Sequence, residues 1–173
     1  PGAALLAGGQ SLIPAMNFRL AAPSRLVDIS RIADLGRIEL ADGAVRVGAA
    51  VRHRDLEEHD GAARANPLIR TALAHVAHVP IRNRGTTVGS LCHADAAAEM
   101  PLVLLLSEGW VTAHGPGGAR RIEADDFFRF HMTTTRAPDE VITEAVFPAL
   151  PEGAGHAFEE FARRRGDYAI AAV

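Results

Sequence analysis

The sequence contains a single cysteine, Cys92, among its 173 residues. One thiol can form no disulfide within the chain, and it cannot supply the several thiolates of a structural zinc or iron–sulfur site. Low cysteine content is typical of proteins from reducing compartments, so we expect a cytoplasmic location. Cys92 itself is predicted to be a small, buried side chain.

The sequence also lacks an excess of positive charge and any long hydrophobic run. Its formal net charge is −3, and its longest basic run is the three arginines at 163–165, which we expect to face solvent. A nucleic-acid-binding protein usually carries a basic patch or has a high pI, so no nucleic-acid partner is predicted. The apolar run at 101–106 is much shorter than the roughly 20 residues that cross a bilayer, so no membrane span is predicted.

The length and the composition, 48% hydrophobic and 23% charged, are ordinary for one globular domain with its own core. The chain begins at Pro1 rather than at a methionine, and it ends within the apolar stretch 168–173. We therefore expect it to be a fragment of a longer protein.

Local patterns predict an alternation of short strands and helices. Residues 3–9 read as a buried strand ended by glycines, and 25–30 as a second strand. Asp42-Gly43 lies between two alternating stretches and predicts a hairpin. Asn66 and Pro67 are typical of a helix start, with Asn66 as the cap. The other predicted elements are a short helical or irregular segment at 11–20, helices at 55–59 and 96–106, a hairpin at 109–123, a helical turn from 125, and strands at 140–148 and 156–164.

Neighbouring strands in hairpins, with helices clustered between them, favour the α+β class over a regular βαβ alternation. The Rossmann fingerprint G-x-G-x-x-G is absent from the sequence.

A glycine loop follows the first predicted strand and reads Gly8-Gly9-Gln10-Ser11. Successive backbone N–H groups in such a loop can form an anion-binding nest, and glycine lets the backbone approach a phosphate closely. Ser11 adds a hydroxyl donor, and Gln10 adds an amide. An ordinary tight turn explains two glycines at a strand end equally well, so this loop needs support from elsewhere in the chain.

A second polar loop is predicted over 82–101, because its glycines and threonines argue against a regular helix. Asp95 and Glu99 offer acceptors for the hydroxyls of a ribose or ribityl chain. Neither glycine loop contains lysine, and both are rich in neutral donors. Together they predict a pyrophosphate held from two sides, as in a dinucleotide. The neutral groups of the second loop are Gly85, Thr86, Thr87, Gly89 and Ser90.

Two segments carry a family resemblance: "LLAGGQSLIPAMNFRLAAPSRLVDIS" at 5–30 and "IRNRGTTVGSLCHADAAAEMP" at 81–101. They resemble the FAD-binding medium subunit of molybdenum hydroxylases, in particular the carbon monoxide dehydrogenase type, within the wider xanthine dehydrogenase family. The resemblance implies an α+β FAD-binding domain of the PCMH type (vanillyl-alcohol oxidase-like). It also implies a small α/β lobe at about 1–50 and a larger lobe of antiparallel sheet and helices at about 51–165.

The same resemblance implies that the chain lacks the first strand and helix of the N-terminus and that 166–173 begins a missing C-terminal domain. The family's first motif, A-G-G-x-S, matches Ala7 to Ser11. Its second motif, T-[IV]-G-G-[NS], reads Thr86 to Ser90 here, with Val88 in place of a glycine. If that position needed a positive φ, valine would weaken a backbone contact. The family's A-D-P becomes 94–96, with alanine in place of proline.

The resemblance implies FAD as the cofactor and no metal site or catalytic side chain in this chain. Tyr168 occupies a position where relatives place a tyrosine close to the flavin ring. The implied FAD-binding residues are Ala7, Gly8, Gly9, Gln10, Ser11, Leu12, Thr86, Thr87, Val88, Gly89, Ser90, Asp95 and Tyr168.

The implied function is electron transfer within an oxidoreductase complex. In the family, substrate is oxidised at a molybdopterin cofactor on a large subunit, and electrons pass through two [2Fe–2S] clusters on a small subunit. The FAD of the medium subunit receives them and passes them to an external acceptor. The resemblance therefore implies both subunits as partners, in a heterotrimer or a dimer of heterotrimers.

Two alternatives remain at this point. A stand-alone flavoenzyme of the same fold would need a general base near the flavin, for which His93 is the only candidate, and we expect His93 beside Asp95 to order the loop by a hydrogen bond instead. A relative that has lost the flavin is the other alternative. His75 and His78 are three residues apart in a predicted helix, but no carboxylate joins them at ligand spacing, so no metal site is predicted.

Overall fold

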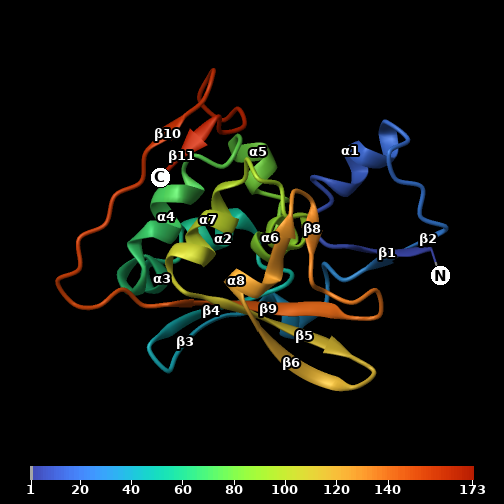
Figure 1. Cartoon of the computed structure of the whole chain (residues 1–173), viewed down its shortest axis with the longest axis horizontal. Coiled ribbons are helices and arrows are strands. Elements are labelled where there is room, and N and C mark those ends of the chain that lie inside the picture. The colour runs from blue at the N-terminus through green and yellow to red at the C-terminus, as the bar shows by residue number, and fades with distance from the viewer. Residues whose placement is uncertain (1) are drawn as a thin grey trace.

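The computed structural model describes residues 2–173 and has three parts (Figure 1). A five-stranded antiparallel sheet carries a layer of helices on one face, a small N-terminal unit stands beside this body, and the C-terminal segment returns across the helical layer. The α+β class is confirmed. No helix within 2–173 is long and apolar enough to cross a membrane.

The small unit is a parallel β–α–β arrangement of β1 (Ala3–Leu6), α1 (Leu12–Asn17) and β2 (Arg25–Asp28). The two strands pair in parallel from Ala3↔Arg25 to Leu6↔Asp28. The prediction of a buried first strand is wrong, because Leu5 keeps 40% of its surface exposed. A two-stranded sheet beside the body lacks the second covering layer that would bury both faces of β1.

The sheet of the body has the order β3–β4–β9–β5–β6. Its first hairpin joins β3 (Ile38–Ala41) to β4 (Ala44–Gly48). Asp42 and Gly43 both have positive φ, 53° and 71°, as a type I′ turn requires, so this predicted hairpin is confirmed. The second hairpin joins β5 (Trp110–Gly115) to β6 (Gly118–Glu123), and β9 (Val141–Pro148) lies between the two hairpins.

This pairing bears on the boundary between the lobes, which the sequence predicted near residue 50. The β3–β4 hairpin pairs with β9 and therefore belongs to the five-stranded sheet of the body. A boundary between β2 and β3 fits this pairing better. The division into domains stays a prediction.

The helices of the body are α2 to α8, and they begin where the sequence offers proline, threonine or acidic residues. Their bounds are α2 His53–Glu57, α3 Asp60–Ala65, α4 Pro67–Leu73, α5 Val79–Arg82, α6 Thr87–His93, α7 Glu99–Leu106 and α8 Ala124–Phe127.

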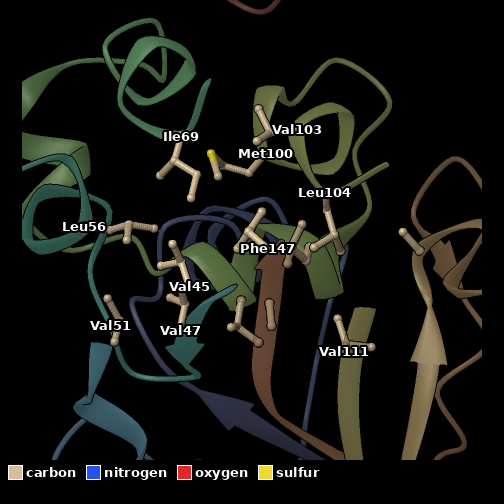
Figure 2. Packing of buried hydrophobic residues seen from close by; sticks show 14 of the residues in the cluster. Val45, Val47, Val51, Leu56, Ile69, Met100, Val103, Leu104, Val111 and Phe147 are labelled. Atoms are coloured by element: carbon tan, nitrogen blue, oxygen red, sulfur yellow. The ribbon is translucent and has the colours of Figure 1, made fainter. Parts of the chain in front are cut away.

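The core lies between the sheet and these helices (Figure 2). Val45, Val47 and Phe147 rise from β4 and β9 and meet side chains such as Leu56 and Ile69 from the helical layer. All five are fully buried, and burying each such side chain is worth about 1.5–3 kcal/mol. This core holds the start of α2 and the start of α6 in fixed positions.

Asn66 occupies the N-cap position of α4, but its side chain does not cap the helix. It is fully buried, and its Nδ2 donates to Ser107 Oγ and to the Pro148 carbonyl, both at 2.9 Å. The side chain therefore ties the start of α4 to the ends of α7 and β9. Long-range hydrogen bonds have displaced the local capping bond that the sequence predicted.

The remaining elements are short, and the predicted strand at 156–164 shrinks to two residues. The arginines 163–165 are exposed, as expected. Three phenylalanines lie close together in the sequence, at 127, 128 and 130. Phe127 is fully buried, whereas Phe130 is 79% exposed. The short elements are η1 Ala33–Gly36, β7 Phe128–Phe130, β8 Thr133–Thr134, β10 Glu160–Phe161 and β11 Ala171–Ala172.

Candidate functional site

The first glycine loop leaves the carboxyl end of β1 and leads into α1. Gly9 has a φ of +72°, a conformation that favours glycine. The backbone N–H groups of Gly8, Gly9, Gln10 and Ser11 donate no hydrogen bond to any atom of residues 2–173. The Gln10 side chain folds back and donates to the Gly8 carbonyl at 3.1 Å, and the Ser11 hydroxyl makes no capping bond. The loop thus presents unpaired donors on a braced backbone.

The second loop contains helix α6 and the last residue of α5, so the prediction that this stretch forms no regular helix is wrong. Thr86 caps α6, its Oγ1 accepting from the N–H of Gly89 at 3.2 Å. A Cβ on Gly89 would lie 2.5 Å from that oxygen, so glycine makes room for the capping hydroxyl. Val88 is helical and buried in the core. The expected conflict between valine and a positive φ therefore does not arise.

The two loops are in direct backbone contact. A Cβ on Gly8 would lie 2.2 Å from the Arg84 carbonyl oxygen, 2.7 Å from Gly85 Cα and 2.9 Å from the Thr86 nitrogen. Only a residue without a side chain fits this position, because backbone atoms cannot swing aside as a flexible side chain would. The structure thus brings together two motifs that are far apart in the sequence.

A buried histidine, which the sequence reasoning missed, holds the second loop in place. The backbone N–H of His53 donates to the Gly85 carbonyl at 2.9 Å, and the ring Nδ1 of His53 lies 3.2 Å from Thr87 Oγ1. Burial, with a smaller contribution from the nearby Arg82 cation, lowers the pKa of His53 to about 4. His53 is therefore neutral at pH 7. The Thr87 hydroxyl is directed at His53 and away from solvent, so it is a support for the loop and not a surface donor.

We predict that Thr87→Val lowers the free energy of unfolding by about 1–2 kcal/mol at pH 7, because it leaves a buried His53 nitrogen without its partner. Urea denaturation of the purified protein measures this loss. Thr133→Val, at an exposed position, is the control and should change stability little. An unchanged midpoint in Thr87→Val would contradict the supporting role of this pair.

Arg82 and Glu57 form a second support that the sequence did not reveal. The buried Arg82 guanidinium donates to Glu57 Oε2 at 2.9 Å and to the Val76 carbonyl at 2.9 Å. This pair attaches α5 to α2. Since α5 leads directly into 84–86, the pair also fixes the backbone that contacts Gly8.

A cleft of about 470 Å³ opens beside the first loop. Four of the predicted binding residues, Ala7 to Gln10, line it. Two charged residues that the sequence reasoning did not assign to the site, Asp28 and Arg84, line it as well. The other lining residues are Leu6, Ile13, Pro14, Asn17 and Ser30.

The other predicted site residues lie outside this lining. Leu12 and Ser90 are half-buried in the first turns of α1 and α6. Asp95 Oδ1 accepts from the Ala97 N–H at 2.9 Å and lies 3.9 Å from His131 Nδ1. Within the described part of the chain Asp95 makes no bond to His93, so the expected pairing of these two residues is wrong, although Asp95 does order its turn.

Tyr168 lies in the C-terminal segment with 74% of its surface exposed. The nearby Gly166 packs against Ala77 and His78, just before α5. The segment is thus anchored beside the stretch that leads to the second loop. Its predicted place near a flavin ring stays a prediction.

Cys92, His75 and His78 add no reactive or metal-binding group to the site. Cys92 packs against the core, and burial raises the pKa of its thiol to about 11, so it stays protonated and unreactive. His75 and His78 lie beyond the end of α4 and do not share a helix. Across 2–173 no three side chains of the metal-binding types come together.

A family model and curated proteins match this chain over most of its length. A family model described as "FAD binding domain in molybdopterin dehydrogenase" matches residues 1–150. Subunit alpha of the 6-hydroxypseudooxynicotine dehydrogenase complex of Paenarthrobacter nicotinovorans is 46% identical, over 97% of this chain and 57% of its own length. The carbon monoxide dehydrogenase medium chain of Hydrogenophaga pseudoflava is 36% identical, over 98% of this chain and 59% of its own.

Solved structures show the same fold. Quinoline 2-oxidoreductase from Pseudomonas putida 86 superposes with a TM-score of 0.95 at 40% identity, over 99% of this chain and 60% of that one. Carbon monoxide dehydrogenase from Hydrogenophaga pseudoflava superposes with a TM-score of 0.96 at 36% identity, with the same coverage. The chain thus spans less than two thirds of the length of these relatives.

Proposed function

Because the chain belongs to the family of FAD binding domains in molybdopterin dehydrogenases, we propose that it is the FAD-binding part of a medium subunit in a molybdenum hydroxylase. One observation carries the proposal. Gly8, Gly9 and Gln10, whose backbone N–H groups are unpaired, line a cleft at the point where Gly8 touches the backbone of 84–86.

The residues present fit FAD in charge and in shape. A pyrophosphate is doubly negative and accepts several hydrogen bonds, and the loop offers four unpaired backbone donors within 8–11. Arg84, which carries a positive charge, lines the same cleft. The missing Cβ at Gly8 keeps the two loops closed on each other. These features support Ala7 to Ser11 as the pyrophosphate cradle.

In this proposal the chain binds and orients the cofactor but performs no bond chemistry itself. FAD supplies the redox capacity when bound, because a flavin accepts electrons singly and can release them in pairs. The backbone donors of 8–11 are fixed before the ligand arrives, so little ordering cost opposes binding. Gln10 stiffens the turn through the Gly8 carbonyl, and His53 with Thr87 fixes the opposite loop. No side chain of the cleft needs to act as a nucleophile or general base.

We propose that the whole subunit accepts electrons from [2Fe–2S] clusters of a small partner subunit and passes them to an external acceptor. Substrate oxidation would take place at molybdopterin on a large subunit, in a heterotrimer or its dimer. The names of the relatives, "medium chain" and "complex subunit", support this division of labour. The single cysteine supports it too, because this chain cannot ligate a cluster alone, and it is consistent with a proposed cytoplasmic location.

The test is an absorbance spectrum of the full-length subunit, desalted after expression alone and with its partner subunits. We expect flavin bands at roughly 370 and 450 nm that persist through desalting, the range of a bound isoalloxazine. We also expect an iron–sulfur subunit to co-purify. A flavin-containing subunit that never associates with one would favour a stand-alone flavoenzyme. A colourless subunit that takes up no added FAD would overturn the proposal.

A further inference from the structure

The small unit places an acidic residue beside the proposed phosphate cradle. Since β1 and β2 are parallel, their carboxyl ends lie at the same edge, where ligands bind in open α/β sheets. Gly8 follows the end of β1, and Asp28 is the last residue of β2, paired with Leu6. Both Gly8 and Asp28 line the 470 Å³ cleft.

The chemistry of Asp28 is at odds with a site that binds only phosphate. Hydrogen bonding from Ser30 holds the pKa of Asp28 below its ordinary value, with a minor contribution from the Arg31 cation, so the carboxylate is charged at pH 7. A fixed negative charge beside a pyrophosphate repels it. Closure of the local turn does not require that charge, because an asparagine oxygen could accept equally well from the Ser30 N–H, which lies 2.9 Å from Asp28 Oδ1.

Ligand hydroxyl groups next to the phosphates could donate hydrogen bonds to the charged Asp28 carboxylate. Ser30 hydrogen-bonds this carboxylate through its backbone N–H, which donates to Oδ1, and through its side chain. A carboxylate has further lone pairs with which to accept from sugar or polyol hydroxyls, and Asp28 lines the cleft. Hydrogen bonds to a charged acceptor are about twice as strong as neutral ones. Arg84, also lining the cleft, carries the opposite charge and suits the phosphates themselves.

We propose that Asp28 is a specificity-determining residue of the cleft. Its carboxylate accepts hydrogen bonds from hydroxyl groups that adjoin the pyrophosphate, and its charge disfavours a bare phosphate ligand. This inference rests on the proposed FAD-binding function and deepens it. Two parts of FAD carry such hydroxyls, the ribose of the adenosine half and the ribityl chain of the flavin half. The chemistry of recognition is the same for both.

The experiment measures dissociation constants by calorimetry on the full-length subunit after removal of its flavin. The ligands are FAD, ADP, FMN and inorganic pyrophosphate. The variants are Asp28→Ala and Asp28→Asn, the second of which keeps an acceptor for the Ser30 N–H and therefore the turn. Asp34→Asn is the control, because Asp34 is an exposed acidic residue outside this cleft.

We expect Asp28→Ala to weaken FAD binding about tenfold or more, the equivalent of one lost hydrogen bond to a charged group. Pyrophosphate binding should be unchanged or tighter, because a repulsive charge is removed. An effect on ADP alone identifies the ribose, and an effect on FMN alone identifies the ribityl chain. Asp28→Asn should likewise tighten pyrophosphate binding, and Asp34→Asn should leave all four constants unchanged.

Equal weakening of pyrophosphate and of the hydroxyl-bearing ligands in both Asp28 variants would overturn the inference, since Asp28 would then act only through the loop. Unchanged binding of every ligand would also overturn it. In both cases wild-type FAD binding would leave the proposed function standing. A wild-type subunit that binds neither FAD nor ADP would overturn the proposed function and this inference together.

Discussion

Replacing Gly8 with alanine is expected to lower the affinity for FAD by about 100-fold or more, the equivalent of two lost hydrogen bonds to a charged ligand. The new Cβ would lie 2.2 Å from the Arg84 carbonyl oxygen, and its other close neighbours are also backbone atoms. The two loops must therefore move apart, which displaces the unpaired N–H groups of 8–11 from the cleft. Titration of flavin-stripped subunit with FAD, followed by flavin fluorescence, measures the effect.

Gly117→Ala provides the matched control, because a Cβ at Gly117 meets no atom within 4 Å and the φ there is not positive. This variant should bind FAD as the wild type does. Overpacking at Gly8 should also cost about 1–3 kcal/mol of stability, so circular dichroism must establish that the variant is folded before titration. A folded Gly8→Ala subunit with wild-type affinity would show that contact between the loops is not needed for binding.

The second large effect concerns Glu99, a buried carboxyl group whose ionisation makes the free energy of unfolding depend on pH. Glu99 begins α7 and is only 7% exposed. Burial raises the pKa of its carboxyl to about 7, and the neighbouring Glu160 and Asp95 carboxylates add to the shift. The Glu160 side chain is itself buried, and its Oε2 lies 3.8 Å from His75 Nδ1. Two further carboxylates thus lie near the start of α7, Asp95 in the turn before it and Glu160 in β10.

A carboxyl group with a raised pKa destabilises the fold once it must ionise. The folded protein keeps the Glu99 proton up to about pH 7, whereas the unfolded chain releases it near pH 4.5. Stability is therefore lost as pH rises from about 4.5 through 7. A shift of this size corresponds to roughly 3 kcal/mol. We predict that Glu99→Gln raises the free energy of unfolding by about that amount at pH 8 and changes it little near pH 4.

His53 contributes with the opposite sign. Its pKa is lowered to about 4 from 6.5, so the stability that neutral His53 confers is complete above pH 6.5 and is lost as pH falls through 4. Between about pH 4.5 and 6.5 the two contributions offset each other in the wild type. Urea denaturation across this range should therefore give nearly constant stability for the wild type but stability rising with pH for Glu99→Gln. Glu152→Gln, at an exposed position, should follow the wild type. Parallel pH profiles for wild type and Glu99→Gln would contradict the assignment.

Local sequence was sufficient for those elements whose stabilising contacts lie within a few residues. The Asp42-Gly43 turn requires positive φ at two successive positions, which this dipeptide adopts readily, so its hairpin was predictable. The turn at the first glycine loop was predictable for a related reason, because glycine readily adopts the positive φ that Gly9 shows at the end of the strand. The family also followed from two short motifs, because their glycines and hydroxyl groups are residue types suited to binding the same ligand.

The second loop shows where this reasoning fails. Thr86 and Gly89 are residues typical of loops, yet here the glycine admits the capping hydroxyl of the threonine and a helix forms. The prediction for Asn66 was wrong in the opposite way. Its side chain donates to two residues distant in the sequence and does not cap the helix.

The sequence by itself determined the fold class, the two glycine motifs and their family, because these depend on residue types and local spacing. Only the tertiary structure decided that Gly8 touches Arg84, that His53 braces Thr87, and that Asp28 and Arg84 share one cleft. Each of these pairs joins segments far apart in the chain. The physical reason is that such contacts arise from packing of the small unit and the helices on the sheet, which no local pattern of residues encodes.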